Sequence, residues 1–310
     1  MMAAPPGRGH HRAMAIITAA RHEGTIRVRE GRQLGVAEFG PPDGKAVIWC
    51  HGTPGARLQI PDEARLIAAA EGIRIIGIDR PGVGLSTGHL YDALVDFAYD
   101  VEIVADRLGL DRFSTVGLSG GGPYALGIAH ALGDRVPSVG VLGGVVPSRG
   151  PDAMGGGLVS VATKFAPVLP LLREPLGILL TGIVRLVRPF GKQGLQLYSM
   201  TSPAGDRAVL ERPEFQTMFL EDLTLNGGRS MRAFIYDAIL FTREWGFSPR
   251  DVTQPVWWWH GDVDHIIPFA HAQHIVPLMP NATLRVRHGE SHLGGLGAAH
   301  EVLQTVLSEW

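Results

Sequence analysis

The sequence lacks the residues that mark several classes of protein. Cys50 is the single cysteine among 310 residues, so no disulfide can form within the chain and a reducing compartment suits it. Neither charge is in excess, because 28 Lys and Arg stand against 30 Asp and Glu. A nucleic-acid-binding protein would need a basic surplus. We therefore expect a small molecule as the partner, and no nucleic acid.

Long uninterrupted apolar runs are also missing. The most apolar region, residues 158–190, is broken by charged side chains, among them Lys164, Arg173, Glu174 and Arg185. A membrane-spanning helix needs about 20 consecutive apolar residues, so we expect no integral span. Residues 1–23 are expected to be a disordered leader rather than a signal peptide, because their apolar run is short and follows two prolines. We expect a cytoplasmic protein, whose oligomeric state the sequence leaves open.

What the chain does have is an alternation of short apolar runs and amphipathic helical stretches. With 45% hydrophobic residues, it can bury a large core. The expected strands cover residues 25–28, 34–39, 46–50, 74–78, 113–117, 139–142, 255–259 and 282–287. Strands that alternate with helices predict an α/β fold with a doubly wound, mostly parallel sheet of about eight strands.

The strand pattern stops between residues 147 and 245, where the sequence becomes helical, apolar and rich in Gly and Pro. Pro175 is expected to open one of the helices there, and Pro189 to end it. The chain therefore divides into a leader at 1–23, an α/β core at 24–146 and 246–310, and an inserted helical cap at 147–245.

One serine stands out because glycines surround it. Residues 117–121 read GLSGG and lie between an expected strand and an expected helix. In that context a G-x-S-x-G motif holds a nucleophilic serine on a tight, exposed turn. Glycines on both sides leave room for the turn and for backbone donors beside the hydroxyl. Ser119 is thus the candidate nucleophile; the alternative is an ordinary glycine-rich turn with a bystander serine.

A nucleophilic serine needs a base and an acid, which follow this motif in the order Ser, Asp or Glu, His. Asp264 lies in the turn after the next-to-last expected strand, with Asp262 as the fallback. His292 lies in the loop between the last strand and the last helix, where its ring can reach the serine, with His288 behind it. We therefore predict a triad of Ser119, Asp264 and His292.

Attack by the serine creates an oxyanion, which needs two backbone N–H donors. The first comes from the residue after the nucleophile, Gly120. The second is expected from Thr53 in the segment HGTPG at 51–55, which directly follows the apolar strand 46–50. The alternative for this segment is a plain turn, but its place at the end of a buried strand favours an oxyanion hole.

Five segments in this order resemble the α/β-hydrolase-fold serine hydrolases, a superfamily that includes esterases and lipases. They are HGTPG at 51–55, DRPGVGLS at 79–86, GLSGG at 117–121, GDVDHIIP at 261–268 and GESHLG at 289–294. The resemblance covers nearly all of the chain after residue 24. It implies that segment 79–86 shapes a turn or lines the pocket without taking part in catalysis.

Differences between the motifs of this chain and those of related families argue against some reactions. Dehalogenases and epoxide hydrolases of this fold place an aspartate where Ser119 stands, so neither activity is expected. Proline iminopeptidases carry HGGPG and a D-Q-R-G segment, whereas this chain has Thr53 and DRPG at 79–82, which argues against that peptidase. His271 and His274 are spaced like metal ligands but lack a third partner, so we expect no metal and no cofactor.

The sequence thus predicts a serine esterase that acts on a small, apolar, ester-like substrate beneath the cap. Three alternatives stay open: a carbon–carbon bond hydrolase or peptidase on the same triad, a binding protein without turnover, and a cofactor-independent lyase or oxygenase. Substrate pockets are mostly apolar. The residues expected to line the pocket are His51, Leu118, Phe215, Met218, Phe219, Met231, Phe234 and His265.

Overall fold

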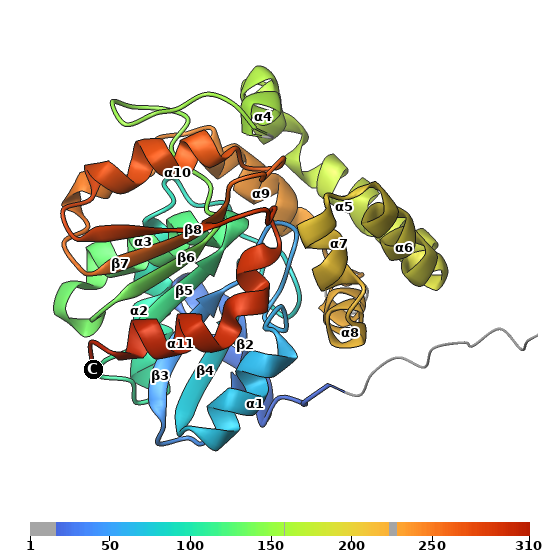
Figure 1. Cartoon of the computed structure of the whole chain (residues 1–310). Coiled ribbons are helices and arrows are strands. Elements are labelled where there is room, and N and C mark those ends of the chain that lie inside the picture. Colours follow the sequence, from blue (N-terminus) through green and yellow to red (C-terminus); the bar gives the residue numbers. More distant parts are fainter. Residues whose placement is uncertain (1–16, 158, 223–227) are drawn as a thin grey trace, which may run out of the picture.

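The computed structural model describes residues 17–157, 159–222 and 228–310 (Figure 1). Within them, eight strands form one sheet, in the order β1-β2-β4-β3-β5-β6-β7-β8. The strands are β1 (His22–Arg27), β2 (Gln33–Phe39), β3 (Lys45–Cys50), β4 (Ile73–Ile78), β5 (Ser114–Leu118), β6 (Val139–Leu142), β7 (Val256–Gly261) and β8 (Ala282–Arg287). β2 runs antiparallel to β1 and β4, and the other neighbouring pairs are parallel. The expected mostly parallel sheet is confirmed.

Helices cover both faces of this sheet. The helices α2 (Asp96–Arg107), α3 (Gly122–Leu132) and α10 (Phe269–Ile275) pack on one face, and α1 (Asp62–Ala70) and α11 (Ala299–Leu307) on the other (Figure 1). Alternate residues of each strand serve the two faces: in β3, Ile48 belongs to the first apolar cluster, and Val47 and Trp49 to the second. Because both faces are buried, the parallel strands are apolar throughout.

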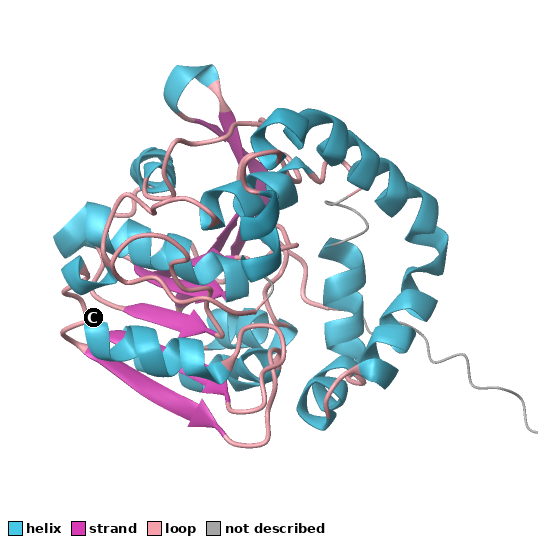
Figure 2. Cartoon of the chain, turned by 90° about the horizontal axis from the view of Figure 1, so that it is seen from above, coloured by secondary structure: helices cyan, strands magenta, loops and turns pink. Residues whose placement is uncertain are grey.

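Between β6 and β7 the chain leaves the sheet and forms a helical insertion. Its helices are α4 (Val159–Phe165), α5 (Leu169–Val187), α6 (Gly191–Thr201), α7 (Ala204–Leu210), α8 (Pro213–Glu221) and α9 (Arg232–Phe241). α5 and α6 lie away from the sheet, whereas α9 lies against the core (Figure 1). Seen from above, a group of helices stands to one side of the sheet (Figure 2). The insertion falls within the range 147–245 that was expected for a cap.

Pro175 does not open the helix in which it lies. α5 already begins at Leu169, and Pro175 stands in its interior, so the expected helix start was wrong. A proline inside a helix removes the N–H that would donate to the carbonyl four residues earlier. That carbonyl belongs to Leu171, which is 80% exposed, so water can replace the missing donor.

The expected leader at 1–23 lies partly outside the described residues, but its last residues belong to the fold. Ile17 is buried in the apolar cluster that includes α1, and the Thr18 N–H donates to the Asp62 carboxylate at 2.7 Å. β1 begins at His22 and pairs with β2. Disorder up to residue 23 was therefore a wrong expectation. The start of this edge strand, His-Glu-Gly, lacks the apolar alternation by which strands are recognised.

No single helix of the described residues is long and apolar enough to cross a membrane. One pair of segments is long and apolar enough only when its two members are taken together. The pair consists of α4 and the segment Leu169–Thr201, which contains α5 and α6. The two members of this pair are bent by 116° relative to each other.

Candidate active site

Ser119 stands at the carboxyl end of β5, on the short turn that leads into α3. Its φ is +51°, a left-handed conformation that is strained for a residue with a side chain. The neighbouring glycines make this turn possible. A Cβ on Gly117 would collide with the Gly121 carbonyl, and a Cβ on Gly121 with the Cys50 carbonyl. The chain thus makes the sharp strand-to-helix turn that the G-x-S-x-G spacing predicts, and it holds the Ser119 hydroxyl half-buried.

Ser119, His292 and Asp264 form a continuous chain of hydrogen bonds. The Ser119 hydroxyl donates to Nε2 of His292 at 2.9 Å, and Nδ1–H of His292 donates to Oδ2 of Asp264 at 2.8 Å. With the carboxylate at Nδ1, the ring carries its proton there and leaves Nε2 to accept. The three residues follow β5, β8 and β7. This arrangement can deprotonate the serine and stabilise the imidazolium that forms.

Further donors hold the Asp264 carboxylate in place. Its Oδ1 accepts the N–H groups of Ile266 and Ile267 at 2.8 and 2.9 Å, and Nε2 of His260 lies 3.3 Å from Oδ2. Burial alone would raise the pKa of Asp264, but the hydrogen bonds from His260, His292 and the backbone hold the pKa of this carboxyl well below its usual range. Asp264 therefore stays ionised, as the partner of an imidazolium must.

His260 supports the Asp264 carboxylate, a role that was not predicted from the sequence. Trp258 donates its indole N–H to Nδ1 of His260 at 3.1 Å, so the proton of the neutral ring is on Nε2. That N–H faces both the Ile267 carbonyl, at 2.8 Å, and the Asp264 carboxylate. A signal was available in the sequence, because a polar side chain that ends a buried strand such as β7 needs a hydrogen-bond partner.

The fallback acid and base pair with each other at the surface. Asp262 lies 2.9 Å from Nδ1 of His288, whose side chain is 84% exposed, and also accepts the Gly289 N–H at 2.8 Å. This pair braces the loop that follows β8. The candidate triad is thus completed by Asp264 and His292, not by Asp262 and His288.

The two expected oxyanion donors are neighbours. A Cβ on Gly120 would collide with Oγ1 of Thr53 and would lie 3.1 Å from the ring of Phe241. The residue after the serine and the loop after β3 therefore face each other with room for no side chain at position 120. Phe241, at the end of α9, adds an apolar wall there that the sequence reasoning missed.

Arg80 fixes the loop that carries Thr53. Its guanidinium donates to the carbonyls of His51 and Gly52 at 2.6 and 2.8 Å, and to Oγ1 of Thr53 at 2.8 Å. The resemblance gave segment 79–86 only a role in shaping a turn or lining the pocket. Asp79 does brace its turn, accepting the Leu85 N–H at 2.9 Å, and it also accepts the Arg57 N–H of the segment after β3 at 2.7 Å. Arg80, in contrast, fixes segment 51–55, which carries the expected donor Thr53 and which we call the oxyanion loop.

The charge partner of Arg80 comes from the insertion. Asp237 on α9 lies 2.7 Å from Arg80 and accepts the hydroxyls of Thr53 and Tyr124 at 2.6 and 2.7 Å. Burial opposes a charge on Arg80, but Asp237 and the other polar partners raise the pKa of Arg80 above its ordinary value. Both charged side chains are 3% exposed. A fully buried ion pair therefore ties α9 to the oxyanion loop.

His51 does not line a pocket, so this expectation was wrong. It is 1% exposed, its Nε2 accepts the Arg80 N–H at 3.2 Å, and its Nδ1–H donates to the Gly52 carbonyl at 2.8 Å. Both ring nitrogens are therefore bound to the backbone. Burial and the charge of Arg80 lower the pKa of His51 well below its usual value, which keeps the ring neutral.

α7 of the insertion supports the loop that carries His292. Asp206 is fully buried, and its Oδ1 accepts the N–H of Leu293 at 2.8 Å, while its Oδ2 has no hydrogen-bond partner among the described residues. A Cβ on Gly205 would lie 2.9 Å from Cα of Glu290, so the first turn of α7 sits directly on this loop. The insertion thus contacts both the histidine loop and the oxyanion loop.

Several other residues expected in the pocket are core residues instead. Phe215 and Met218 on α8 are 2% and 0% exposed and pack in the apolar cluster that includes α1 and α11. Leu118 is 3% exposed in the same cluster, and Met231 is 7% exposed with its backbone bridged to Val83. The apolar spacing that suggested a pocket for Phe215, Met218 and Met231 serves packing here, so their expected role was wrong. Leu118, at the end of β5, is a core residue as well.

The three remaining candidates are more accessible. Phe219 is partly buried against the same cluster, and Phe234 is 37% exposed on α9. The ring of His265 is hydrogen-bonded through Nδ1 to the Ser291 hydroxyl at 2.9 Å. His265 thereby links the loop of Asp264 to the loop of His292.

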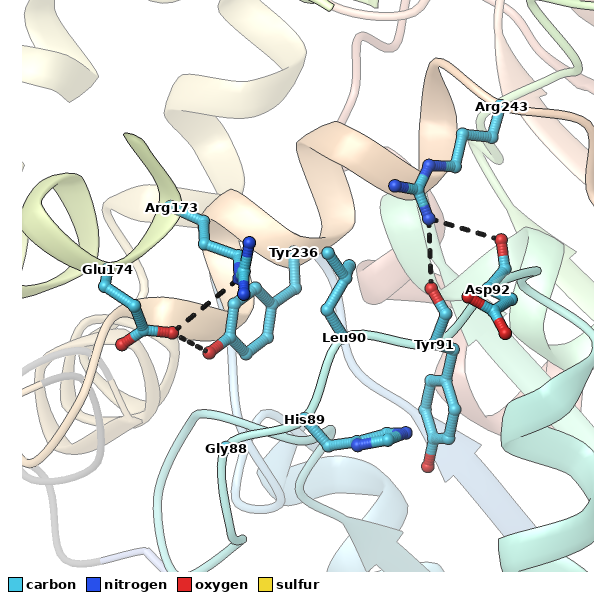
Figure 3. Close-up of a pocket in the computed structure, with 9 residues that line it drawn as sticks. All are labelled: Gly88, His89, Leu90, Tyr91, Asp92, Arg173, Glu174, Tyr236 and Arg243. Carbon is cyan, nitrogen blue, oxygen red and sulfur yellow. Dashed lines mark hydrogen bonds and ion pairs between the residues drawn. The ribbon is translucent and has the colours of Figure 1, made fainter. Parts of the chain in front are cut away.

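A pocket of about 380 Å³ opens between loop 88–92 and the helices α5 and α9 (Figure 3). Arg173 and Arg243 stand on opposite sides of it, and Glu174 accepts the Tyr236 hydroxyl at 2.9 Å. Arg243 donates to two backbone carbonyls of the loop. The residues that line this pocket include no member of the candidate triad or oxyanion loop, so it is separate from the site around Ser119.

Residues 17–157, 159–222 and 228–310 contain no group of three or more His, Cys, Asp or Glu side chains placed to hold a metal ion. His271 and His274 instead contact the carbonyls of Gly155 and Asp152, at 3.1 and 3.0 Å. Burial raises the pKa of Cys50 to about 12, so its thiol is not a competing nucleophile.

Known sequences similar to this chain carry different names. A family model described as alpha/beta hydrolase fold matches residues 45–297. The chain is 27% identical to a non-heme chloroperoxidase of Streptomyces lividans over 90% of its own length and 96% of that protein. It is 34% identical to a proline iminopeptidase of Neisseria gonorrhoeae over 133 residues. The latter match spans 41% of the peptidase, well under half of its length.

Solved structures resemble the chain over nearly its whole length. An esterase from Exiguobacterium antarcticum has a TM-score of 0.66 and 19% identity, over 92% of this chain and 97% of that one. A bromoperoxidase from Bacillus anthracis has a TM-score of 0.67 and 20% identity, over 93% and 100%. Identities this low show a shared fold. Since the family model covers most of the sequence, the chain belongs to the alpha/beta hydrolase fold family.

Proposed function

We propose that this protein is a serine hydrolase that cleaves a carboxylic ester of a small, apolar substrate. The observation that carries the proposal is the chain of hydrogen bonds from Ser119 through His292 to Asp264, with the serine on a strained turn. Such a constellation is recognised by its geometry, because the same chemistry occurs on unrelated folds. A structural neighbour named as an esterase is in keeping with it.

In the first half of the reaction, Ser119 becomes acylated. His292 takes the serine proton through Nε2 as the serine oxygen attacks the ester carbonyl. The ionised Asp264 stabilises the resulting imidazolium, which then gives its proton to the departing alcohol. Water attacks the acyl-enzyme in the second half, with His292 as the base again, and releases the acid and free Ser119.

The backbone N–H groups of Gly120 and Thr53 bind the oxyanion in both halves. Such donors are effective because they are fixed before the charge develops. Arg80 supplies that rigidity for the second donor through its bonds to the loop. Phe241 next to Gly120 makes the nearby wall apolar, which favours an apolar acyl group over a charged one.

The test is the variant Ser119→Ala, assayed on short p-nitrophenyl esters. We expect kcat/KM to fall by at least about a thousandfold, as on removal of other triad nucleophiles, while urea unfolding stays unchanged. Ser308→Ala is the matched control, because it removes an exposed hydroxyl just after α11. A fluorophosphonate probe should label the wild type and the control but not Ser119→Ala. Ester hydrolysis that persists without the Ser119 hydroxyl would overturn the proposal.

The probe also separates an enzyme from a binding protein of the same fold. If the wild type neither reacts with the fluorophosphonate nor hydrolyses any ester, Ser119 is not an activated nucleophile and the fold serves binding. Labelling at Ser119 without ester turnover would instead point to another reaction on the same residues.

A peptidase is the second candidate, favoured by the 34% identity to a proline iminopeptidase. The match covers only part of that protein, and Thr53 and DRPG at 79–82 depart from the peptidase motifs. Proline p-nitroanilide and p-nitrophenyl esters, compared at equal concentration, distinguish the two. We expect the ester to be preferred. The opposite preference would replace the esterase by a peptidase and leave Ser119 as nucleophile.

A further inference from the structure

α5 is apolar on nearly all sides, although only one side is packed. Leu176 and Leu180 are half-buried, and between them Gly177 lies against Arg232 of α9. Leu179 and Leu186, in contrast, are 58% and 75% exposed. A helix that is apolar all round is normally buried. The outward side of α5 is therefore exposed to solvent although its residues are apolar.

Exposed apolar side chains are also frequent on the neighbouring helices α4 and α6. Fourteen of the nineteen exposed large apolar side chains of the described residues lie between 161 and 200. The most exposed are Leu171 (80%), Leu186 (75%), Met200 (73%), Phe190 (64%) and Leu197 (64%). We call this surface, made by the exposed apolar side chains of 161–200, the outer face. Apolar surface concentrated in this way marks an interaction site.

The charged side chains in the segment that carries the outer face are almost all positive. Segment 153–205 contains five basic residues, Lys164, Arg173, Arg185, Arg188 and Lys192, and all five are exposed. Its single acidic residue, Glu174, is bound by Arg232 and Tyr236 at 2.8 and 2.9 Å. A second copy of the chain on this face would bring like charges together, which opposes association. An anionic surface would be attracted instead.

We propose that the outer face docks on the surface of an anionic lipid bilayer. Exposed leucine and phenylalanine side chains provide the apolar area that enters the boundary of the acyl chains, and the basic residues provide attraction to lipid phosphates. The 116° bend between α4 and the segment Leu169–Thr201 suits helices that lie on a bilayer rather than cross it. This proposal does not depend on the reaction at Ser119.

The experiment is co-sedimentation of the full chain with lipid vesicles, carried out with Ser119→Ala so that no lipid can be hydrolysed through that residue. One set of vesicles is phosphatidylcholine alone, and the other contains equal parts of phosphatidylcholine and phosphatidylglycerol. We expect binding to the anionic vesicles to be at least about tenfold tighter, and to weaken as salt screens the charges.

Two variants separate the apolar from the electrostatic contribution. The triple variant Leu171→Gln, Leu186→Gln, Phe190→Gln and the double variant Arg188→Glu, Lys192→Glu should each weaken binding to the anionic vesicles by at least about tenfold. Leu66→Gln in α1 and Arg107→Glu in α2 are matched controls, since both residues are exposed and lie outside the outer face. The controls should bind as the parent does.

Three results would overturn the proposal. The first is a parent protein that stays in the supernatant with both kinds of vesicle. The second is equal binding to neutral and anionic vesicles. The third is a stable dimer, seen by sedimentation without lipid, that the triple variant dissolves, because a second copy would then cover the outer face. Loss of esterase activity is not among the readouts, so failure here and failure of the proposed function are distinguishable.

Discussion

The core and the insertion contribute to the candidate site in different ways. The core places Ser119, Asp264 and His292 at the ends of three strands, where the side chains meet directly. The insertion brings buried carboxylates, Asp206 and Asp237, that contact the loops around those residues. The candidate reacting groups therefore come from one part of the chain and much of their positioning from the other.

A second contrast exists within the insertion itself. α9 and α7 face the core and carry buried charges with specific partners, whereas α5 and α6 expose apolar side chains. We call α7 and α9 the inner helices, and α5 and α6 the outer helices. We expect substitutions in the core to have the largest effects on activity and stability, those in the inner helices smaller effects, and those in the outer helices the smallest.

The largest effect is expected from Asp264→Asn in the core. An amide at this position no longer stabilises the imidazolium and favours the wrong tautomer of His292, so kcat should fall by about 10⁴-fold with little change in fold. Asp262→Asn is the control, because Asp262 pairs with exposed His288. Steady-state ester hydrolysis measures both. Equal losses of kcat in the two variants would show that Asp264 has no catalytic role that Asp262 lacks.

The next effect is expected from Asp237→Ala on the inner helix α9. It leaves the buried charge of Arg80 without its partner, which should lower the free energy of unfolding by about 3–5 kcal/mol. The looser oxyanion loop should also lower kcat more than it raises KM. Urea unfolding and ester kinetics are the measurements.

Glu174→Ala on α5 is the matched comparison for Asp237→Ala. It also removes a carboxylate that pairs with an arginine, Arg232, but the two side chains are 47% and 37% exposed. We expect a loss of no more than about 1 kcal/mol. Similar losses in both variants would contradict the contrast between inner and outer helices.

A smaller effect is expected from Asp206→Ala on α7. The buried N–H of Leu293 would lose its acceptor, at a cost of about 1–3 kcal/mol. Asp206→Asn keeps an acceptor oxygen and should restore most of the stability. If α7 positions the loop of His292, kcat should be lowest in Asp206→Ala, higher in Asp206→Asn and highest in the wild type, at constant KM. Full activity in Asp206→Ala would show that the core alone positions the histidine.

The smallest effect concerns pH and His51, beneath the oxyanion loop. Burial and Arg80 lower the pKa of His51 in the folded state, so the unfolded chain binds the extra proton first as pH falls below about 6.5. This ring therefore contributes stability at neutral pH that is lost progressively toward acid. Urea unfolding at pH 7 and pH 5 should show a smaller difference for His51→Gln than for the wild type. An unchanged difference would contradict the assignment of a neutral ring.

The sequence predicted what depends on local pattern. Each of the eight strands was expected within a few residues of its place, because apolar runs and turn residues mark them. Ser119, Asp264 and His292 were recognisable because each follows a strand in the required order. The structure brings these three together.

Contacts between distant segments could not be predicted in this way. Arg80 and Asp237 are 157 residues apart, and nothing local marks them as partners. Phe215 and Met218 were expected in the pocket because apolar residues at helical spacing look the same in a core and in a binding site. His51 was misassigned because its neighbours, the carbonyl of Gly52 and the N–H of Arg80, are backbone groups.

The ion pair between Arg80 and Asp237 limits how the insertion can be exchanged. A chimaera that keeps this core but receives the helices of another hydrolase would leave Arg80 charged in a dry interior, and the Leu293 N–H without its acceptor. Grafts should therefore retain α7 and α9 with Asp206 and Asp237, and vary only α4 to α6. For protein engineers, only the helices α4 to α6 of the insertion are therefore open to exchange.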